Sequence, residues 1–124
     1  MILVDTSVWA DHFRQTVPAL SDLLGAGDVL MHPFVIGELA LGNLQRRDAT
    51  LRLLRELPSS NVVTDDRFAE ESLAADLVAS GIGFVDAHLL LAVRAQRGTS
   101  LWSRDKRLAA KASALGIRWD GETT

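Results

Sequence analysis

The sequence has 124 residues, of which 48% are hydrophobic and 23% are charged, and this profile predicts one globular domain over residues 1–124. It contains no cysteine, which excludes disulfides, thiol catalysis, zinc ribbons and iron–sulfur clusters. The net charge of −3 argues against a simple basic DNA-coating protein, and no secretory signal or membrane-spanning run is visible, so we expect a soluble, cytoplasmic protein.

The first half of the chain alternates short apolar runs with helical patterns. Residues 2–4 form a continuous apolar run, which is typical of a strand buried on both faces of a parallel sheet. Helical patterns then extend to about residue 25 and are followed by a second apolar run at 29–31. A helix is expected from Pro33 to Gly42, and Pro58 closes another.

The second half continues this alternation. Strands are expected at 61–64, 100–103 and 117–119, and helices at about 66–80, at 85–97 and up to residue 116. The polar tail 120–124 is expected to fray. Short buried strands that alternate with helices predict an α/β fold around a mainly parallel sheet of four to five strands.

The charges are unevenly distributed along the chain. Residues 65–76 hold five acids and one base, whereas residues 94–118 hold seven bases and one acid. The basic interval can meet a polyanion, and two solvated helix faces of opposite sign explain the same pattern.

Four acidic residues occupy positions where ligands bind in open parallel sheets, outside the carboxyl ends of the strands. Asp5 follows the first strand, Glu38 lies in the helix after the second, Asp86 opens a helix and Asp105 follows the strand at 100–103. Four carboxylates at one end of a sheet repel one another unless a cation is bound. Hard oxygen ligands of this kind favour Mg²⁺ or Mn²⁺.

Each carboxylate also has a structural explanation. Asp105 is a suitable cap for the last helix, and Asp86 suits the first turn of its own helix. Glu38 has apolar neighbours and therefore needs solvent or a partner. Asp5 is the hardest to explain structurally, because an acid at the end of a buried strand is destabilising unless it is compensated.

Four segments resemble the signature of the PIN domain family in order and spacing. They are Val4–Ser7, the helix around Glu38, Val85–His88 and Leu101–Asp105, and the resemblance covers essentially the whole chain. It implies a three-layer α/β/α fold and a metal-dependent endoribonuclease. A PIN protein of this size is most similar to the VapC-type ribonuclease toxins of bacterial type II toxin–antitoxin modules, which implies inhibition by a VapB-type antitoxin.

The resemblance also implies roles for individual residues. The family's acidic quartet corresponds to Asp5, Glu38, Asp86 and Asp105. Its hydroxyl after the first acid corresponds to Thr6 or Ser7, and another hydroxyl position corresponds to Ser103. We expect the three aspartates to hold Mg²⁺, with Mn²⁺ as a substitute, and Glu38 to position a water. The hydroxyls would orient the carboxylates.

Three bases beside the last acid are candidates for contacting substrate phosphates. They are Arg104, Lys106 and Arg107, for which a solvated helix start is the alternative. The three histidines are expected to be structural. His88 in particular lies two residues after Asp86, so on a helix it points about 200° away.

Two other functions remain open at this point. A phosphoacceptor receiver domain has a similar length and sheet, but it calls for paired acids after the first strand, where this sequence has Thr6 and Ser7 after Asp5. A catalytically silent PIN-fold binding module is the second alternative, although such a module need not retain the acids. Among nucleases, the sequence does not separate RNA from DNA as substrate.

The expected partners follow from the resemblance. An RNA substrate and a VapB-type antitoxin are implied, and we expect the antitoxin to bring an Arg or Lys to the carboxylates. A homodimer within the toxin–antitoxin assembly is also expected. Apolar faces around Trp9, Phe13 and Phe34 would bury the antitoxin or a second protomer.

Overall fold

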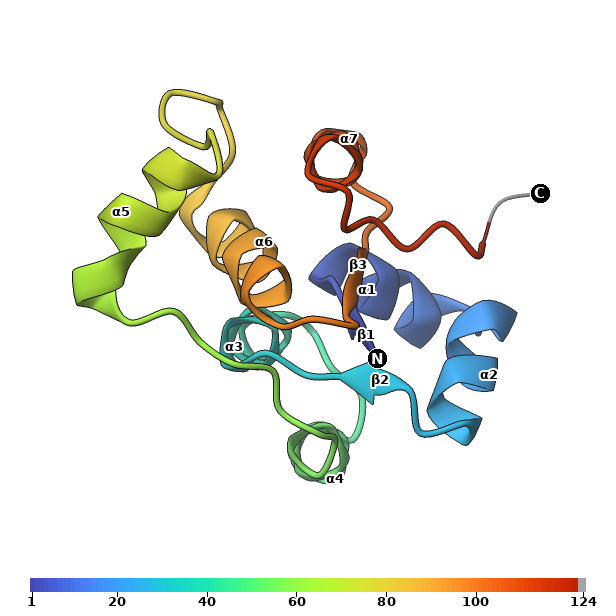
Figure 1. The fold of residues 1–124 in the computed structure, drawn as a ribbon. Coiled ribbons are helices and arrows are strands. Elements are labelled where there is room, and N and C mark those ends of the chain that lie inside the picture. Colours follow the sequence, from blue (N-terminus) through green and yellow to red (C-terminus); the bar gives the residue numbers. More distant parts are fainter. Residues whose placement is uncertain (123–124) are drawn as a thin grey trace.

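The computed structural model describes residues 1–122 and is built around a parallel sheet (Figure 1). Its strands are β1 (Ile2–Val4), β2 (Val29–Leu30) and β3 (Ser100–Trp102), in the order β2-β1-β3. Leu3 of β1 pairs with Leu30 on one side and with Leu101 on the other. The central strand β1 is therefore paired on both edges, and its Leu3 and Val4 are fully buried.

Isolated parallel bridges extend the sheet at both edges. Met31 pairs with Ser59 beyond β2, and Leu101 pairs with Arg118 beyond β3. The expected strand at 117–119 is represented by the bridge at Arg118, at the sheet edge. The parallel α/β sheet is confirmed, with three strands and a single bridge at each edge in residues 1–122 where four to five strands were expected. The expected strand at 61–64 is wrong, because the pairing occurs earlier, at Ser59, and the following residues are mostly exposed.

Helices cover both faces of the sheet, which confirms the three-layer α/β/α architecture. Figure 1 shows α1 and α2 on one side of the strands and α3, α5 and α6 on the other. In residues 1–122 the helices are α1 (Thr6–Arg14), α2 (Pro18–Gly25), α3 (Pro33–Leu41), α4 (Arg47–Arg55), α5 (Asp65–Ala74), α6 (Phe84–Ala95) and α7 (Lys106–Ala114).

Helix α6 lies in the core between α5 and β3. Every residue from 87 to 93 is buried, so this helix is apolar around most of its circumference. Its only acidic residue in the first turn is Asp86, at the end nearest the sheet's carboxyl edge. The core thus fixes the helix that carries one of the four candidate acids.

Two expectations about helix and chain ends are wrong. Helix α5 ends at Ala74 and does not reach residue 80, because the chain turns through positive φ angles at Asp76 and Ala79. In the tail that was expected to fray, Glu122 is instead held by Arg104, while residues 123 and 124 lie outside the described residues. None of the helices in residues 1–122 has the length and apolar character that crossing a membrane requires.

Candidate active site

Asp5 is placed at the centre of the site by the sheet itself. Its backbone N–H donates to the carbonyl oxygen of Trp102 at 2.9 Å, which joins the end of β1 to β3. Its side chain is only 4% exposed. The carboxylate oxygen Oδ2 accepts hydrogen bonds from Ser7 Oγ and Ser103 Oγ, both at 2.7 Å. These two short bonds compensate for burying the charge.

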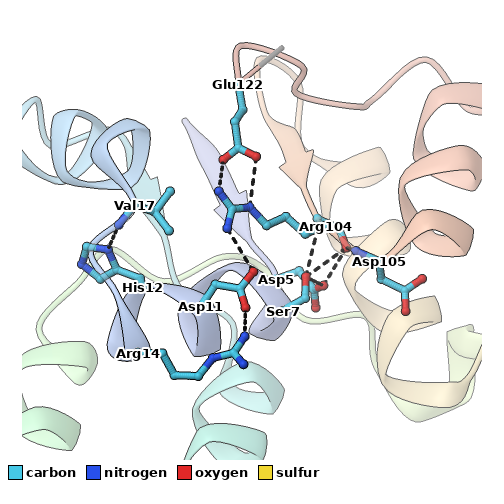
Figure 2. Close-up of polar contacts among 10 residues, drawn as sticks. Asp5, Ser7, Asp11, His12, Arg14, Val17, Arg104, Asp105 and Glu122 are labelled. Atoms are coloured by element: carbon cyan, nitrogen blue, oxygen red, sulfur yellow. Dashed lines mark hydrogen bonds and ion pairs between the residues drawn. The ribbon is translucent and has the colours of Figure 1, made fainter. Parts of the chain in front are cut away.

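The loop between β3 and α7 orients both serine hydroxyls. The backbone N–H of Arg104 donates to Ser7 Oγ, and that of Asp105 donates to Ser103 Oγ, each at 3.0 Å. Because each hydroxyl oxygen already accepts a backbone proton, its own O–H is directed at Asp5 (Figure 2). No donor in residues 1–122 bonds to the second oxygen of Asp5, Oδ1, which is left available to a ligand.

Glu38 is exposed on α3 and is held from α1. Thr6 Oγ1 donates to Glu38 Oε1 at 2.7 Å. The helix that carries Glu38 begins at a cap formed by His32, whose Nδ1 accepts the backbone N–H of Phe34 at 3.0 Å. Thr6 therefore orients the carboxylate, while His32 fixes the start of its helix.

The carboxyl group of Asp86 is perturbed by its surroundings. Partial burial raises its pKa to about 6, and the charges of Asp5, Asp105 and Glu38 contribute in the same direction. The structure thus brings Asp5, Asp105 and Glu38 within electrostatic reach of Asp86. Asp105 also caps α7, because its Oδ1 accepts the backbone N–H of Leu108 at 3.0 Å.

The arrangement fits a hard divalent cation in its chemistry. Within residues 1–122, no three His, Cys, Asp or Glu side chains are gathered in a group that could already hold a metal ion. The donors are nevertheless carboxylate oxygens, the type that Mg²⁺ and Mn²⁺ prefer. The pKa of Asp86 is raised partly by like charges, and a bound cation would relieve this repulsion.

Arg104 lies in a network of ion pairs rather than over the acids. Its guanidinium bonds to Glu122 through Nε and Nη2, at 3.0 and 2.7 Å, and to Asp11 through Nη1 at 3.0 Å. Asp11 also pairs with Arg14. These hydrogen bonds raise the pKa of Arg104, and the bonds that it donates to Glu122 have the largest effect. Figure 2 shows the side chains of Arg104 and Asp105 pointing in opposite directions.

The other two candidate bases start α7, and both are exposed. Arg107 donates from Nη1 to the carbonyl oxygen of Gly81 at 3.1 Å, which ties α7 to the segment before α6. Gly81 has a φ of +83°, a conformation that residues with a Cβ rarely adopt. Lys106, the first residue of α7, is the base that follows Asp105 directly.

His88 is packed among aromatic rings, which agrees with the structural role expected for it. Its ring centroid lies 4.5 Å from Phe68, 4.7 Å from Phe84 and 4.8 Å from Phe34. Phe34 therefore contributes to this internal cluster. Trp9, expected on a partner-binding face, is buried at 2% exposure. Of the three residues expected there, Phe13 is the one that is clearly exposed, at 41%.

Sequence reasoning missed the two partners of Arg104. Asp11 lies four residues after Ser7 on α1, a spacing that places both on one helix face and offered a usable signal. Glu122 lies in a polar tail and carried no comparable signal. The ring cluster around His88 also joins residues too distant in sequence for any local pattern to show.

Comparisons with known proteins agree with the geometry. The sequence model of the PIN domain matches residues 2–114, a range that contains all four acids. Two relatives named Ribonuclease VapC32 come from Mycobacterium tuberculosis strains CDC 1551 / Oshkosh and ATCC 25618 / H37Rv. Each is 45% identical to this chain over 117 residues, which cover 94% of this chain and 94% of the relative.

Proposed function

The chain belongs to the PIN domain family, and on this premise we propose that it is a divalent-metal-dependent endoribonuclease, the toxin of a toxin–antitoxin module. The observation that carries the proposal is the state of Asp5. This buried carboxylate is fixed by two serine hydroxyls, keeps Oδ1 available and lies within electrostatic reach of Asp86. The name of the 45% identical relatives supports RNA as the substrate.

Asp5, Asp86 and Asp105 would hold the metal, Mg²⁺ with Mn²⁺ as a substitute. When bound, the ion activates a water and neutralises the charge that develops on the scissile phosphate. Ser7 and Ser103 would orient Asp5 through their bonds to Oδ2.

Glu38 has a separate role in this proposal. Because Thr6 occupies Oε1, the exposed Oε2 of Glu38 is free to accept a hydrogen bond from the attacking water. Glu38 would thereby orient the water and accept its proton. Thr6 thus acts as a positioning residue for Glu38.

The bases would contact phosphates on either side of the cut. Lys106 is exposed beside Asp105 and needs no rearrangement. Arg104 has to exchange a carboxylate for a phosphate, and Arg107 has to release Gly81. All three would position the RNA without reading its sequence.

The receiver-domain alternative is wrong, since the chain is a PIN domain. The silent binding module is disfavoured because all four acids are present and Asp5 is oriented at the cost of burying a charge. We further propose a VapB-type antitoxin that covers the acids with a basic side chain, a homodimer inside that assembly and one cytoplasmic domain over residues 1–124.

The test is cleavage of total RNA by the purified protein with Mg²⁺ or Mn²⁺. Cutting at discrete positions should disappear with EDTA and in Asp5→Asn and Asp86→Asn. A folded, metal-supplied wild type that cuts no RNA would contradict the proposal. Co-expression with the adjacent gene should yield a small co-purified protein that suppresses cleavage.

A further inference from the structure

A hollow of about 860 Å³ lies beside Glu38 and is lined from α1, α3, the connection between α3 and α4, and Thr50 of α4. Thr6 and Glu38, the pair joined by a 2.7 Å hydrogen bond, line it, so the hollow is continuous with the candidate active site. Its volume falls within the range of about 300–1,000 Å³ that is usual for small-ligand sites. An RNA strand that places a phosphate at the acids therefore brings a neighbouring nucleotide to this hollow.

An aromatic ring from α1 forms part of the lining. Phe13 is 41% exposed, and its ring is held near Trp9 and His12, with centroid separations of 5.8 and 6.2 Å. His12 is itself fixed, because its Nδ1 accepts the backbone N–H of Val17 at 3.0 Å (Figure 2). Phe13 is thus a supported ring that still faces solvent, which suits it to stack on a nucleobase.

Two carboxamides from the α3–α4 connection also line the hollow. Asn43 and Gln45 are both exposed, and neither side-chain amide has a hydrogen-bond partner in residues 1–122. Each amide offers a donor and an acceptor, which is the pattern presented by the edge of a nucleobase. The backbone at Gln45 is positioned in advance, because its carbonyl oxygen accepts a hydrogen bond from Thr50 Oγ1 at 3.0 Å.

A positively charged side chain also lines the hollow. Arg14 is part of its lining, and the ion pair with Asp11 orients the guanidinium. Two more exposed bases, Arg46 and Arg47, follow Gln45 directly in the chain. These positive charges offset the acids for an incoming phosphodiester strand.

We propose that this hollow is a nucleobase subsite, in which one unpaired nucleotide next to the scissile phosphate stacks on Phe13 and is hydrogen-bonded by Asn43 and Gln45. The inference rests on the proposed ribonuclease function and makes it more specific: the substrate is single-stranded at the cut and carries a preferred base there. A single exposed ring with free amides fits a base better than the row of apolar anchors that a docked amphipathic helix uses.

The first test compares cleavage kinetics of wild type, Phe13→Ala, Phe13→Trp, Asn43→Ala and Gln45→Ala on short oligoribonucleotides with every base at the positions flanking the cut. Phe13→Ala should raise KM roughly tenfold to a hundredfold with little change in kcat, and Phe13→Trp should restore KM. Asn43→Ala and Gln45→Ala should weaken the base preference. Leu73→Ala, which removes an exposed side chain on α5, is the matched control.

The second test measures binding without cleavage, so that it does not depend on activity. A hexaribonucleotide with one 2-aminopurine is titrated into Asp86→Asn in EDTA, and stacking on Phe13 should quench its fluorescence. Phe13→Ala in the same background should abolish the quench. If wild type cuts no RNA but this quench is present, the cleavage proposal fails and the subsite stands.

The opposite results would overturn the inference. Unchanged KM, base preference and quenching in all the variants, with unchanged thermal unfolding, would show that no base is held in the hollow. If those properties are unchanged but the co-expressed small protein no longer binds Phe13→Ala, the hollow is a protein-docking surface and the nucleobase subsite is wrong.

Discussion

The two halves of the acidic site are held in different ways. In the hydrogen-bonded half, Asp5 is fixed by Ser7, Ser103 and the backbone amides of the β3–α7 loop. In the ring-packed half, the helices carrying Glu38 and Asp86 meet through the cluster of aromatic and histidine rings formed by His32, Phe34, Phe68, Phe84 and His88.

This difference shows which parts of the site are positioned atom by atom. Hydrogen bonds fix the direction of a carboxylate, whereas ring packing fixes only where a helix lies. Three buried ring nitrogens, His32 Nε2 and both nitrogens of His88, have no partner in the described part of the chain. Glu38 is held in addition by Thr6, whereas the side chain of Asp86 forms no hydrogen bond within residues 1–122, so ring packing alone places Asp86.

The largest expected effect comes from Asp86→Asn, which should reduce cleavage on the order of a thousandfold. The same change should raise the melting temperature in EDTA, because it removes one of four repelling charges. Mg²⁺ should raise the melting temperature of wild type and not of the variant. Calorimetry and RNA cleavage check these results, and Asp22→Asn, at an exposed acid on α2 that forms no ion pair within residues 1–122, is the control. A variant that melts lower in EDTA would contradict this account of the four acids.

Acidification should weaken the ring-packed half. Burial, and then the charge of His88, lower the pKa of His32 to about 4 from the usual 6.5. A lowered histidine pKa means that the neutral form is favoured in the folded state, so this contribution is complete above about pH 6.5. It should be lost as the pH falls towards 4, at a cost of about 3 kcal/mol of unfolding free energy.

The free energy of unfolding is measured in urea at pH 7.5 and pH 4 for wild type and for His32→Asn. This variant removes the titratable group and keeps a residue suited to the helix cap. The difference between the two pH values should be smaller in the variant than in wild type. Equal differences would mean that His32 does not carry the effect.

Within the hydrogen-bonded half, Ser7→Ala or Ser103→Ala should each reduce cleavage by roughly 10-fold to 100-fold. Each also removes one of the two bonds to the buried Oδ2 of Asp5, which should lower the unfolding free energy by about 1–3 kcal/mol. Ser113→Ala, at an exposed position on α7, controls for loss of a hydroxyl. Full activity in the double variant would show that Asp5 needs no orientation.

The smallest expected effect is at the edge of the hydrogen-bonded half. Glu122→Gln removes one of the two carboxylates on Arg104, an exposed pair that contributes about 1 kcal/mol or less to folding. The freed guanidinium should strengthen RNA binding a few-fold and steepen its salt dependence. RNA binding is measured at 50 and 200 mM salt for Glu122→Gln placed in the Asp86→Asn background, in which RNA cleavage should be almost abolished. Glu56→Gln in the same background is the charge-matched control. Unchanged binding would mean that Arg104 stays with Asp11.

The sequence was sufficient for the three strands of the sheet and for the position of Asp5 at the end of the first, because both depend on local patterns. An apolar run ending in an acid predicts a buried strand and the place where Asp5 lies. The edge pairing was misplaced because Val62 and Val63 favour a strand locally, whereas tertiary contacts select Ser59.

Long-range partners were beyond such reasoning. Arg104 meets Asp11 across 93 residues and Glu122 across 18, and no periodicity links them. The bond from Ser103 to Asp5 was suggested only by the family resemblance. Local propensity places elements, but side-chain pairing between them is decided by packing.

The bond between Ser103 and Asp5 also has a consequence for protein synthesis, since it spans 98 residues. A nascent chain contains Asp5 long before it contains β3, so the central strand lacks one neighbour and its acid lacks one hydroxyl. At about 5–20 residues per second, the ribosome needs roughly 5 to 20 seconds to close this gap. The carboxylate site therefore assembles late in translation: an unfinished chain that stops before β3 carries Asp5, Glu38 and Asp86, but it lacks Asp105 and the serine hydroxyl of Ser103 that orients Asp5.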